Sequence, residues 1–216
     1  MVFNNYQIIK NAVDINLVNF IKDYFILKRD TVSYMIEHNV IINHNEILGT
    51  WNDSQAPNTY SHYADPVMET LLIKMIPVIK KHTKLNLIPT YSYARIYKKG
   101  DELKRHKDRP NCEISTTIHL GGDPWSIYLE PSGKKGLKGK EINLKPGDML
   151  IYKGCKLEHW REKFKGKQCV QVFLHYNYHN AKSKLNKFDT RPMLGLPTCF
   201  RKAEIMEKDI WKINGK

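Results

Sequence analysis

The chain has 216 residues, and its 35 Lys and Arg against 22 Asp and Glu give a formal charge of +13 at pH 7. A hydrophobic content of 41% is enough to build a core, which excludes a wholly disordered protein. The sequence contains no N-terminal apolar segment and no run of eighteen apolar residues, so we expect a cytoplasmic protein without a signal peptide or a membrane partner. Its four cysteines form no CxxC pair, which argues against a disulfide framework or a thiolate zinc site.

Two amphipathic helices are predicted in the N-terminal part. Apolar residues recur at helical spacing in residues 14–28, and again in residues 65–82, where Pro66 suits a first turn. Residues 31–63 between them show no clear period, which suggests short strands and a long loop, either a lid or irregular packing on the core. We expect residues up to about 87 to form a helical support.

Residues 88–178 change to a period of two. Successive segments read as short strands separated by turns, for example IPTYSYARIY, STTIHLG and KQCVQVFLHYNY. This pattern favours an antiparallel sandwich or barrel, and hence an α+β chain. A C-terminal extension from about 179 contains the turn-rich residues 191–197 and then a predicted short basic helix. Because no sharp boundary interrupts the sequence, residues 1–216 are predicted to form one domain.

The positive charge is concentrated in the second part of the chain. Residues after 96 carry 26 Lys and Arg against 14 Asp and Glu. A solvated lysine-rich surface is the commoner cause of such an excess, and a polyanionic or acidic partner is the alternative.

A metal site is predicted from His106 and Asp108. In an extended backbone, residues i and i+2 point to the same face, so the imidazole and the carboxylate can share one ion. A second histidine from a distant strand would complete a facial triad, and His159 follows 53 residues later. The competing histidines are His119, His175 and His179. Two imidazoles and one carboxylate leave open positions that suit Fe(II); zinc ranks lower because no evident general base lies near His106.

The chain then resembles a known family. The run YARIYKKGDELKRHKD, the later PGDMLIYKG and the segment EHWRE are similar to Fe(II)- and 2-oxoglutarate-dependent dioxygenases, especially the prolyl 4-hydroxylase-like branch with its small phage and bacterial members. The similarity covers about residues 88–178. It implies a double-stranded β-helix (jelly roll) with N-terminal helices packed on one sheet. It also implies an oxidoreductase whose catalytic and iron ligands are His106, Asp108 and His159.

The same resemblance implies that 2-oxoglutarate and O₂ are consumed, with ascorbate as a possible reductant. Tyr97 matches the tyrosine of the branch that contacts 2-oxoglutarate. A cation is needed for the far carboxylate of the cosubstrate, and Lys167 is the preferred match, with Arg161 and Lys165 as rivals. For Tyr97 the alternative is a plain core tyrosine.

Other side chains are expected around this centre. Tyr128 and Gln171 are predicted to project into the barrel and to bind the cosubstrate, with interior packing as the alternative. Arg109, Trp160 and Arg161 lie beside the ligands in the sequence and are the expected substrate-binding groups.

The branch implies a substrate that is a prolyl residue in a peptide or protein, as in procollagen-proline 4-hydroxylation. Two alternatives stay open. One keeps the oxygenase chemistry but directs it to a nucleobase or a free amino acid. The other is a non-catalytic basic jelly-roll module that binds nucleic acid.

Overall fold

The computed structural model describes residues 3–42, 46–180 and 183–202. The helices are α1 (Ile15–Glu37) and α2 (Pro66–Thr83), and short 3₁₀ segments are η1 (Ser183–Thr190) and η2 (Thr198–Phe200). The strands are β1 (Tyr6–Ile9), β2 (Tyr60–Tyr63), β3 (Leu87–Lys98), β4 (Leu103–His106), β5 (Ile114–Gly122), β6 (Ile127–Leu129), β7 (Lys140–Ile142), β8 (Met149–Tyr152), β9 (His159–Arg161) and β10 (Gln168–Tyr178).

The strands form two antiparallel sheets. One has six strands in the order β1-β8-β5-β10-β3-β2, and the other has four in the order β4-β9-β6-β7. Ile127 and Leu129 of the small sheet pack against Leu150 and Tyr152 on the inner face of β8. This two-sheet arrangement fits the predicted jelly roll.

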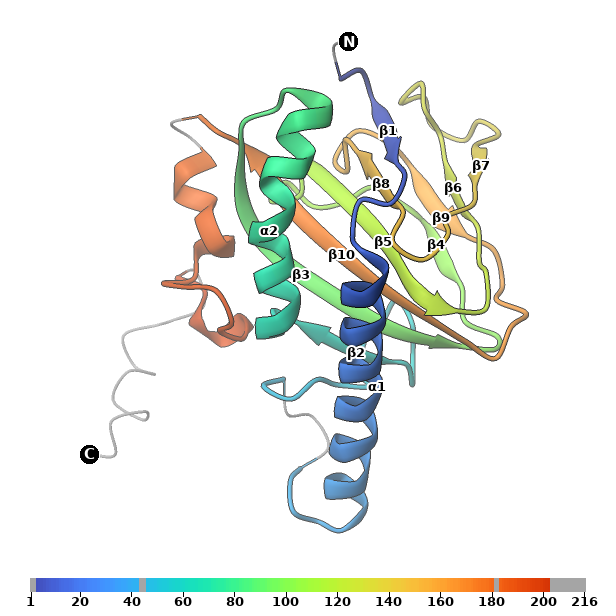
Figure 1. The fold of residues 1–216 in the computed structure, drawn as a ribbon, viewed down its shortest axis with the longest axis vertical. Helices are drawn as coiled ribbons and strands as arrows, with labels where there is room; N and C mark the ends of the chain where they lie inside the picture. The colour runs from blue at the N-terminus through green and yellow to red at the C-terminus, as the bar shows by residue number, and fades with distance from the viewer. Residues whose placement is uncertain (1–2, 43–45, 181–182, 203–216) are drawn as a thin grey trace.

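Both long helices lie on the outer face of the six-stranded sheet (Figure 1). Helix α1 contacts β5, and α2 contacts β3 and β10. Strand alternation explains this packing, because Val170, Val172 and Leu174 of β10 join the core beneath the helices, whereas Cys169 and Phe173 belong to a separate cluster on the opposite face. The helices therefore leave the inner face of the six-stranded sheet free to carry a site.

Both helices begin at an aspartate cap. The Asp14 carboxylate accepts from the backbone N–H of Asn16, and the Asp65 carboxylate accepts from that of Val67. Each cap satisfies amide groups that have no partner within the helix.

The first helix is longer than the sequence predicts, since it continues to Glu37 through residues 31–37. Val32 is buried in this added turn, so the apolar stripe persists beyond residue 28. The rest of the 31–63 segment supplies β2 and a loop that reaches the site described below. The predicted basic helix falls mainly on residues 203–216, which lie outside the described residues. Among the described helices, none combines the length and apolar character needed to cross a membrane.

Candidate active site

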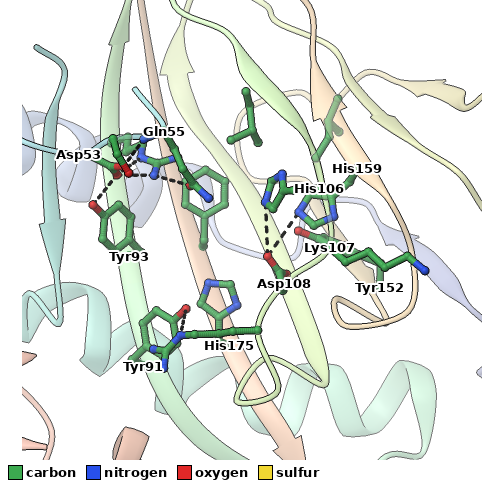
Figure 2. A pocket seen from close by; sticks show the side chains of 16 residues that line it. Asp53, Gln55, Tyr91, Tyr93, His106, Lys107, Asp108, Tyr152, His159 and His175 are labelled. Carbon is green, nitrogen blue, oxygen red and sulfur yellow. Dashed lines mark hydrogen bonds and ion pairs between the residues drawn. The ribbon is translucent and has the colours of Figure 1, made fainter. Parts of the chain in front are cut away.

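His106, Asp108 and His159 meet at one point between the sheets (Figure 2). His106 ends β4 and His159 begins β9, and the two residues face each other in the register of these paired strands. The Asp108 Oδ1 atom lies 3.6 Å from Nε2 of His106 and 3.5 Å from Nε2 of His159. Three potential ligand atoms all lie within 4.8 Å of one another, which is the spacing a single ion requires.

The backbone fixes which nitrogen of each imidazole is available. Nδ1 of His106 lies 2.7 Å from the Lys104 carbonyl oxygen, and Nδ1 of His159 lies 3.2 Å from that of Leu157. A carbonyl can only accept, so each Nδ1 carries the proton and each Nε2 keeps its lone pair. Both lone pairs are thus available to a metal beside Asp108.

The Asp108 carboxylate is held by its second oxygen. Oδ2 accepts a 2.6 Å hydrogen bond from Ser115 Oγ, and the Asp108 backbone N–H donates to the Gly154 carbonyl. A β-carbon at Gly154 would overlap both Ser115 Oγ and Asp108 Oδ2, so this close approach requires glycine. Oδ1 therefore remains directed at the two histidines.

His175 supports this arrangement from β10. Its Nδ1 lies 3.1 Å from Ser115 Oγ, and burial lowers the pKa of His175 to about 4. The ring is neutral at pH 7, and because the serine proton is given to Asp108, Nδ1–H of His175 is the donor to Ser115. Burial would raise the pKa of Asp108, but when no metal occupies the Nε2 lone pairs and His159 and His106 carry protons there, their charge and hydrogen bonds hold that pKa well below its usual range, so the carboxylate is ionised.

We expect Ser115→Ala to weaken metal affinity by roughly 10-fold, because groups that orient a ligand typically affect affinity by about 10- to 100-fold. Isothermal titration with Mn(II) measures the change. Thr116→Ala, on the same strand but bonded to the Leu174 carbonyl, is the matched control. Unchanged affinity in Ser115→Ala would show that the hydroxyl does not position Asp108.

A cavity of about 430 Å³ opens beside these three side chains. Tyr91, Tyr93 and Arg95 of β3 line it together with Phe173 and His175 of β10. These residues occupy alternate positions of their strands, so they share the inner face of the six-stranded sheet. The result is a largely aromatic wall that faces His106, Asp108 and His159 (Figure 2).

The loop before β2 closes one side of the cavity. Asp53 makes an ion pair with Arg95 and accepts a 2.6 Å hydrogen bond from the Tyr93 hydroxyl, while Gln55 Oε1 accepts a 2.8 Å bond from Arg95. Part of the aperiodic 31–63 segment is thus a wall of the cavity.

Arg109 also lines the cavity and is held by the C-terminal segment. Its guanidinium donates two hydrogen bonds to Asp189, of 2.9 and 2.6 Å, and lies 4.4 Å from the centre of the Tyr91 ring. The Asp189 carboxylate also accepts from Asn111 and from Tyr63. The charge of Arg109 is therefore compensated within the chain.

Further polar side chains lie in the interior near His159. Arg161 is 2% exposed, its Nη1 donates to the Trp125 carbonyl, and its Nη2 lies 3.4 Å from Thr117 Oγ1. Gln171 also faces inward as predicted, where its Nε2 lies 2.9 Å from His119 Nδ1. Tyr97 is fully buried, and its hydroxyl accepts a 3.0 Å hydrogen bond from Arg95.

Three predicted site residues lie elsewhere. Tyr128 does not project into the barrel but stacks on Trp160, with ring centres 5.5 Å apart. Trp160 in turn lies under the Arg105 guanidinium, 4.1 Å away, and does not line the cavity. The cause is strand alternation, since the immediate neighbours of each residue face inward. Lys167 is exposed just before β10, not inside the barrel.

Sequence reasoning missed Ser115, Asp53 and Asp189 as site residues. Ser115 stands opposite His175 in the β5–β10 register, which no local motif reveals. Asp53 and Asp189 come from irregular segments far from the ligands in the sequence, so only the tertiary structure brings them to the cavity.

Comparison with known proteins identifies similar folds but no close relative. No family model matches the chain, and no curated protein matches it. A prolyl-4-hydroxylase from Pseudomonas putida superposes with a TM-score of 0.60 at 11% identity, covering 82% of this chain and 94% of that one. The non-heme α-ketoglutarate-dependent epimerase SnoN from nogalamycin biosynthesis gives 0.59 at 10% identity, covering 80% and 76%. The viral collagen prolyl hydroxylase of Paramecium Bursaria Chlorella virus-1, a complex with 2OG, gives 0.53 at 11% identity, covering 82% and 97%.

Proposed function

We propose that this chain, whose fold is that of 2-oxoglutarate- and iron-dependent oxygenases, is itself such an enzyme and hydroxylates prolyl residues in a peptide or protein. The observation that carries the proposal is the convergence of His106, Asp108 and His159 beside an aromatic cavity. The fold alone would not suffice, because one fold supports many activities.

The residues present fit Fe(II) and a dicarboxylate. Two neutral imidazoles and one ionised carboxylate form the donor set of non-heme iron oxygenases and leave coordination positions open. They leave a bound Fe(II) with a net charge of about +1, which favours a dianion beside it. The interior next to His159 also holds the Arg161 guanidinium, whose buried Nε has no partner among the described residues. A buried unpaired donor of this kind suits an anionic ligand.

His106, Asp108 and His159 would hold the iron, and iron with 2-oxoglutarate and O₂ would supply the oxidising power. One oxygen atom of O₂ would enter a substrate C–H bond as a hydroxyl and the other would enter succinate as CO₂ is released, which balances the oxidation. The chain holds the ligands in place through Ser115 and the backbone. It places the substrate in the cavity opposite them.

The cavity wall supports a prolyl substrate. Tyr91, Tyr93 and Phe173 present aromatic faces, on which an apolar pyrrolidine ring packs well. Arg95 and Arg109 line the same cavity, but Asp53 and Asp189 compensate their charges. The wall is therefore suited to a neutral ring more than to a polyanion.

The test supplies the full chain with Fe(II), 2-oxoglutarate, O₂ and ascorbate, and measures succinate by mass spectrometry. A proline-rich peptide is compared with the same peptide carrying alanine for proline, and with single-stranded DNA and free proline. We expect succinate formation coupled to a gain of one oxygen atom on the proline peptide alone. His106→Ala should abolish both signals, whereas His82→Ala, which changes an exposed histidine of α2, should keep them.

Two results would contradict the proposal in different ways. Oxidation of DNA or of free proline in place of the peptide would keep the oxygenase chemistry and overturn the prolyl-peptide substrate. DNA binding that persists in His106→Ala, without succinate from any substrate, would favour the non-catalytic module.

A further inference from the structure

A second cavity adjoins the cavity of the candidate active site. It has a volume of about 350 Å³, and Asp53, Ser54 and Tyr93 line both cavities. Figure 2 shows Asp53 and Tyr93 across the first cavity from His106. The second cavity therefore continues the first one in the direction away from the candidate metal site.

The second cavity is polar and acidic. Glu46 and Asp53 are its charged side chains, and no lysine or arginine of the described residues lines it. Hydroxyl groups supply much of the remaining lining, among them those of Thr50, Ser61 and Thr198. This lining contrasts with the whole chain, which has 35 Lys and Arg against 22 Asp and Glu. A cavity rich in acceptors and negative charge favours a cationic donor over an anion.

The two carboxylates differ in their partners. Asp53 makes an ion pair with Arg95 of the first cavity, which compensates its charge. Glu46 is exposed, and its Oε2 atom accepts a hydrogen bond from the Thr198 hydroxyl, which is uncharged. Because a carboxylate has about four acceptor sites, this one bond leaves Glu46 able to receive a charged donor.

The bond between Glu46 and Thr198 also fixes the position of the carboxylate. It joins the segment before β2 to the start of η2, across 152 positions of the sequence. A side chain that is already held in place loses less conformational entropy when a ligand binds. Glu46 is thus oriented by the C-terminal segment before any ligand enters.

The cavity sizes indicate which residue of a peptide would reach Glu46. Cavities of about 430 and 350 Å³ have widths of roughly 7 Å, and an extended peptide advances about 3.3 Å per residue. A peptide whose prolyl residue occupies the first cavity therefore places a side chain in the second cavity about two residues away.

We propose that the second cavity binds a lysine or arginine side chain of the substrate peptide, with Glu46 as its partner. This inference rests on the proposed function and narrows its substrate class to proline-containing peptides with a basic residue near the proline. Asp53 keeps its ion pair with Arg95 and forms the boundary between the two subsites. The lysine-rich surface elsewhere on the chain would favour acidic peptides, so the two influences predict opposite preferences.

The decisive experiment compares peptides that differ in one residue beside the proline. Proline-rich peptides carry lysine, glutamine or glutamate at each flanking position in turn. The full chain receives Fe(II), 2-oxoglutarate, O₂ and ascorbate, and peptide oxidation measured by mass spectrometry gives kcat and KM. At the position that reaches Glu46, we expect the KM of the lysine peptide to be roughly 3- to 5-fold below that of the glutamine peptide, the range for a solvent-accessible charge pair. The glutamate peptide should have the highest KM, and kcat should be the same for all three, because the contact lies away from the reacting atoms.

Two variants of Glu46 sharpen the test. Glu46→Gln should abolish the difference between the lysine and glutamine peptides, and Glu46→Lys should reverse the order so that the glutamate peptide has the lowest KM. Glu37→Gln is the matched control, because Glu37 is also exposed and also accepts from a hydroxyl, that of Ser33, but lines neither cavity. It should keep the preference of the wild type for lysine.

The outcomes separate this inference from the proposed function. Equal KM values for the three peptides at every position, a lowest KM for the glutamate peptide, or a lysine preference that Glu46→Gln retains would overturn the assignment to Glu46 and leave prolyl hydroxylation standing. If the wild type oxidises none of the peptides, the proposed function is wrong and the inference falls with it.

Discussion

Asp108→Ala is expected to abolish metal binding and all metal-dependent turnover. The Asp108 carboxylate is the single anionic member of the triad, and its Oδ1 lies 3.6 and 3.5 Å from the two imidazole Nε2 atoms. Without it, two neutral rings remain, with no charge to hold a divalent cation. Because the loss of an orienting group already costs about 10- to 100-fold in affinity, loss of the ligand itself should exceed about 100-fold.

The measurement is a competition titration with Mn(II) or Ni(II), followed by the succinate assay. Asp148→Ala is the control, since that carboxylate is buried and bonded to Lys10 and Asn11 but takes no part in the triad. Asp108 is 12% exposed and Asp148 is 2% exposed at the side chain, so a general loss of packing would affect both variants. Metal affinity that survives in Asp108→Ala would show that the ion is held elsewhere.

Strand geometry and the family resemblance together selected the three side chains that the structure brings to one point. His106 and Asp108 are two residues apart, and strand geometry alone places such residues on one face. His159 was chosen over His119, His175 and His179 because it follows a turn and a strand 53 residues after His106, and the structure places it opposite His106 in the β4–β9 register. The two-sheet fold followed from the period of two over residues 88–178.

The sequence predictions were wrong where they required knowing which side chains of a strand point into the barrel. Trp160 adjoins His159 in the sequence, yet neighbours on a strand point to opposite faces, and it lies outside the cavity. Lys167 was chosen by its spacing from His159 in related enzymes, but the turn at Gly166 leaves it exposed. Arg161 was a rival whose burial no pattern in the sequence indicates. Asp189 was not considered, because its contact with Arg109 joins residues 80 positions apart.

Asp189 makes the C-terminal segment part of the site. Phe188, Asp189 and Thr190 all have φ between 55° and 68°, a left-handed conformation that non-glycine residues rarely adopt. The cost of this backbone must be offset by contacts, and the buried Asp189 carboxylate provides them through Arg109, Asn111 and Tyr63. The loop that follows Asp108 is therefore tied to residues 188–190.

We expect Asp189→Ala to lower the free energy of unfolding by about 2–3 kcal/mol at pH 7. Breaking a buried ion pair costs about 3–5 kcal/mol, and the 36% exposure of the Arg109 side chain reduces this value. Urea unfolding followed by circular dichroism measures it. Asp23→Ala removes an exposed ion pair on α1 and should change stability by less than about 0.5 kcal/mol.

The pH dependence gives this prediction a sign. Burial would raise the pKa of Asp189, but the hydrogen bonds and charge of Arg109, with Asn111 and Tyr63, hold it below its usual value. A carboxyl whose pKa is lower in the folded state stabilises the fold fully above its unfolded pKa of about 4, and this contribution is lost as the pH falls through the folded pKa. The difference in unfolding free energy between wild type and Asp189→Ala should therefore stay constant from about pH 6 to about pH 8 and shrink as the pH falls below that range. A difference that grows in acid would mean that Asp189 is protonated in the native protein, and that its hydrogen bonds, rather than its charge, anchor the segment.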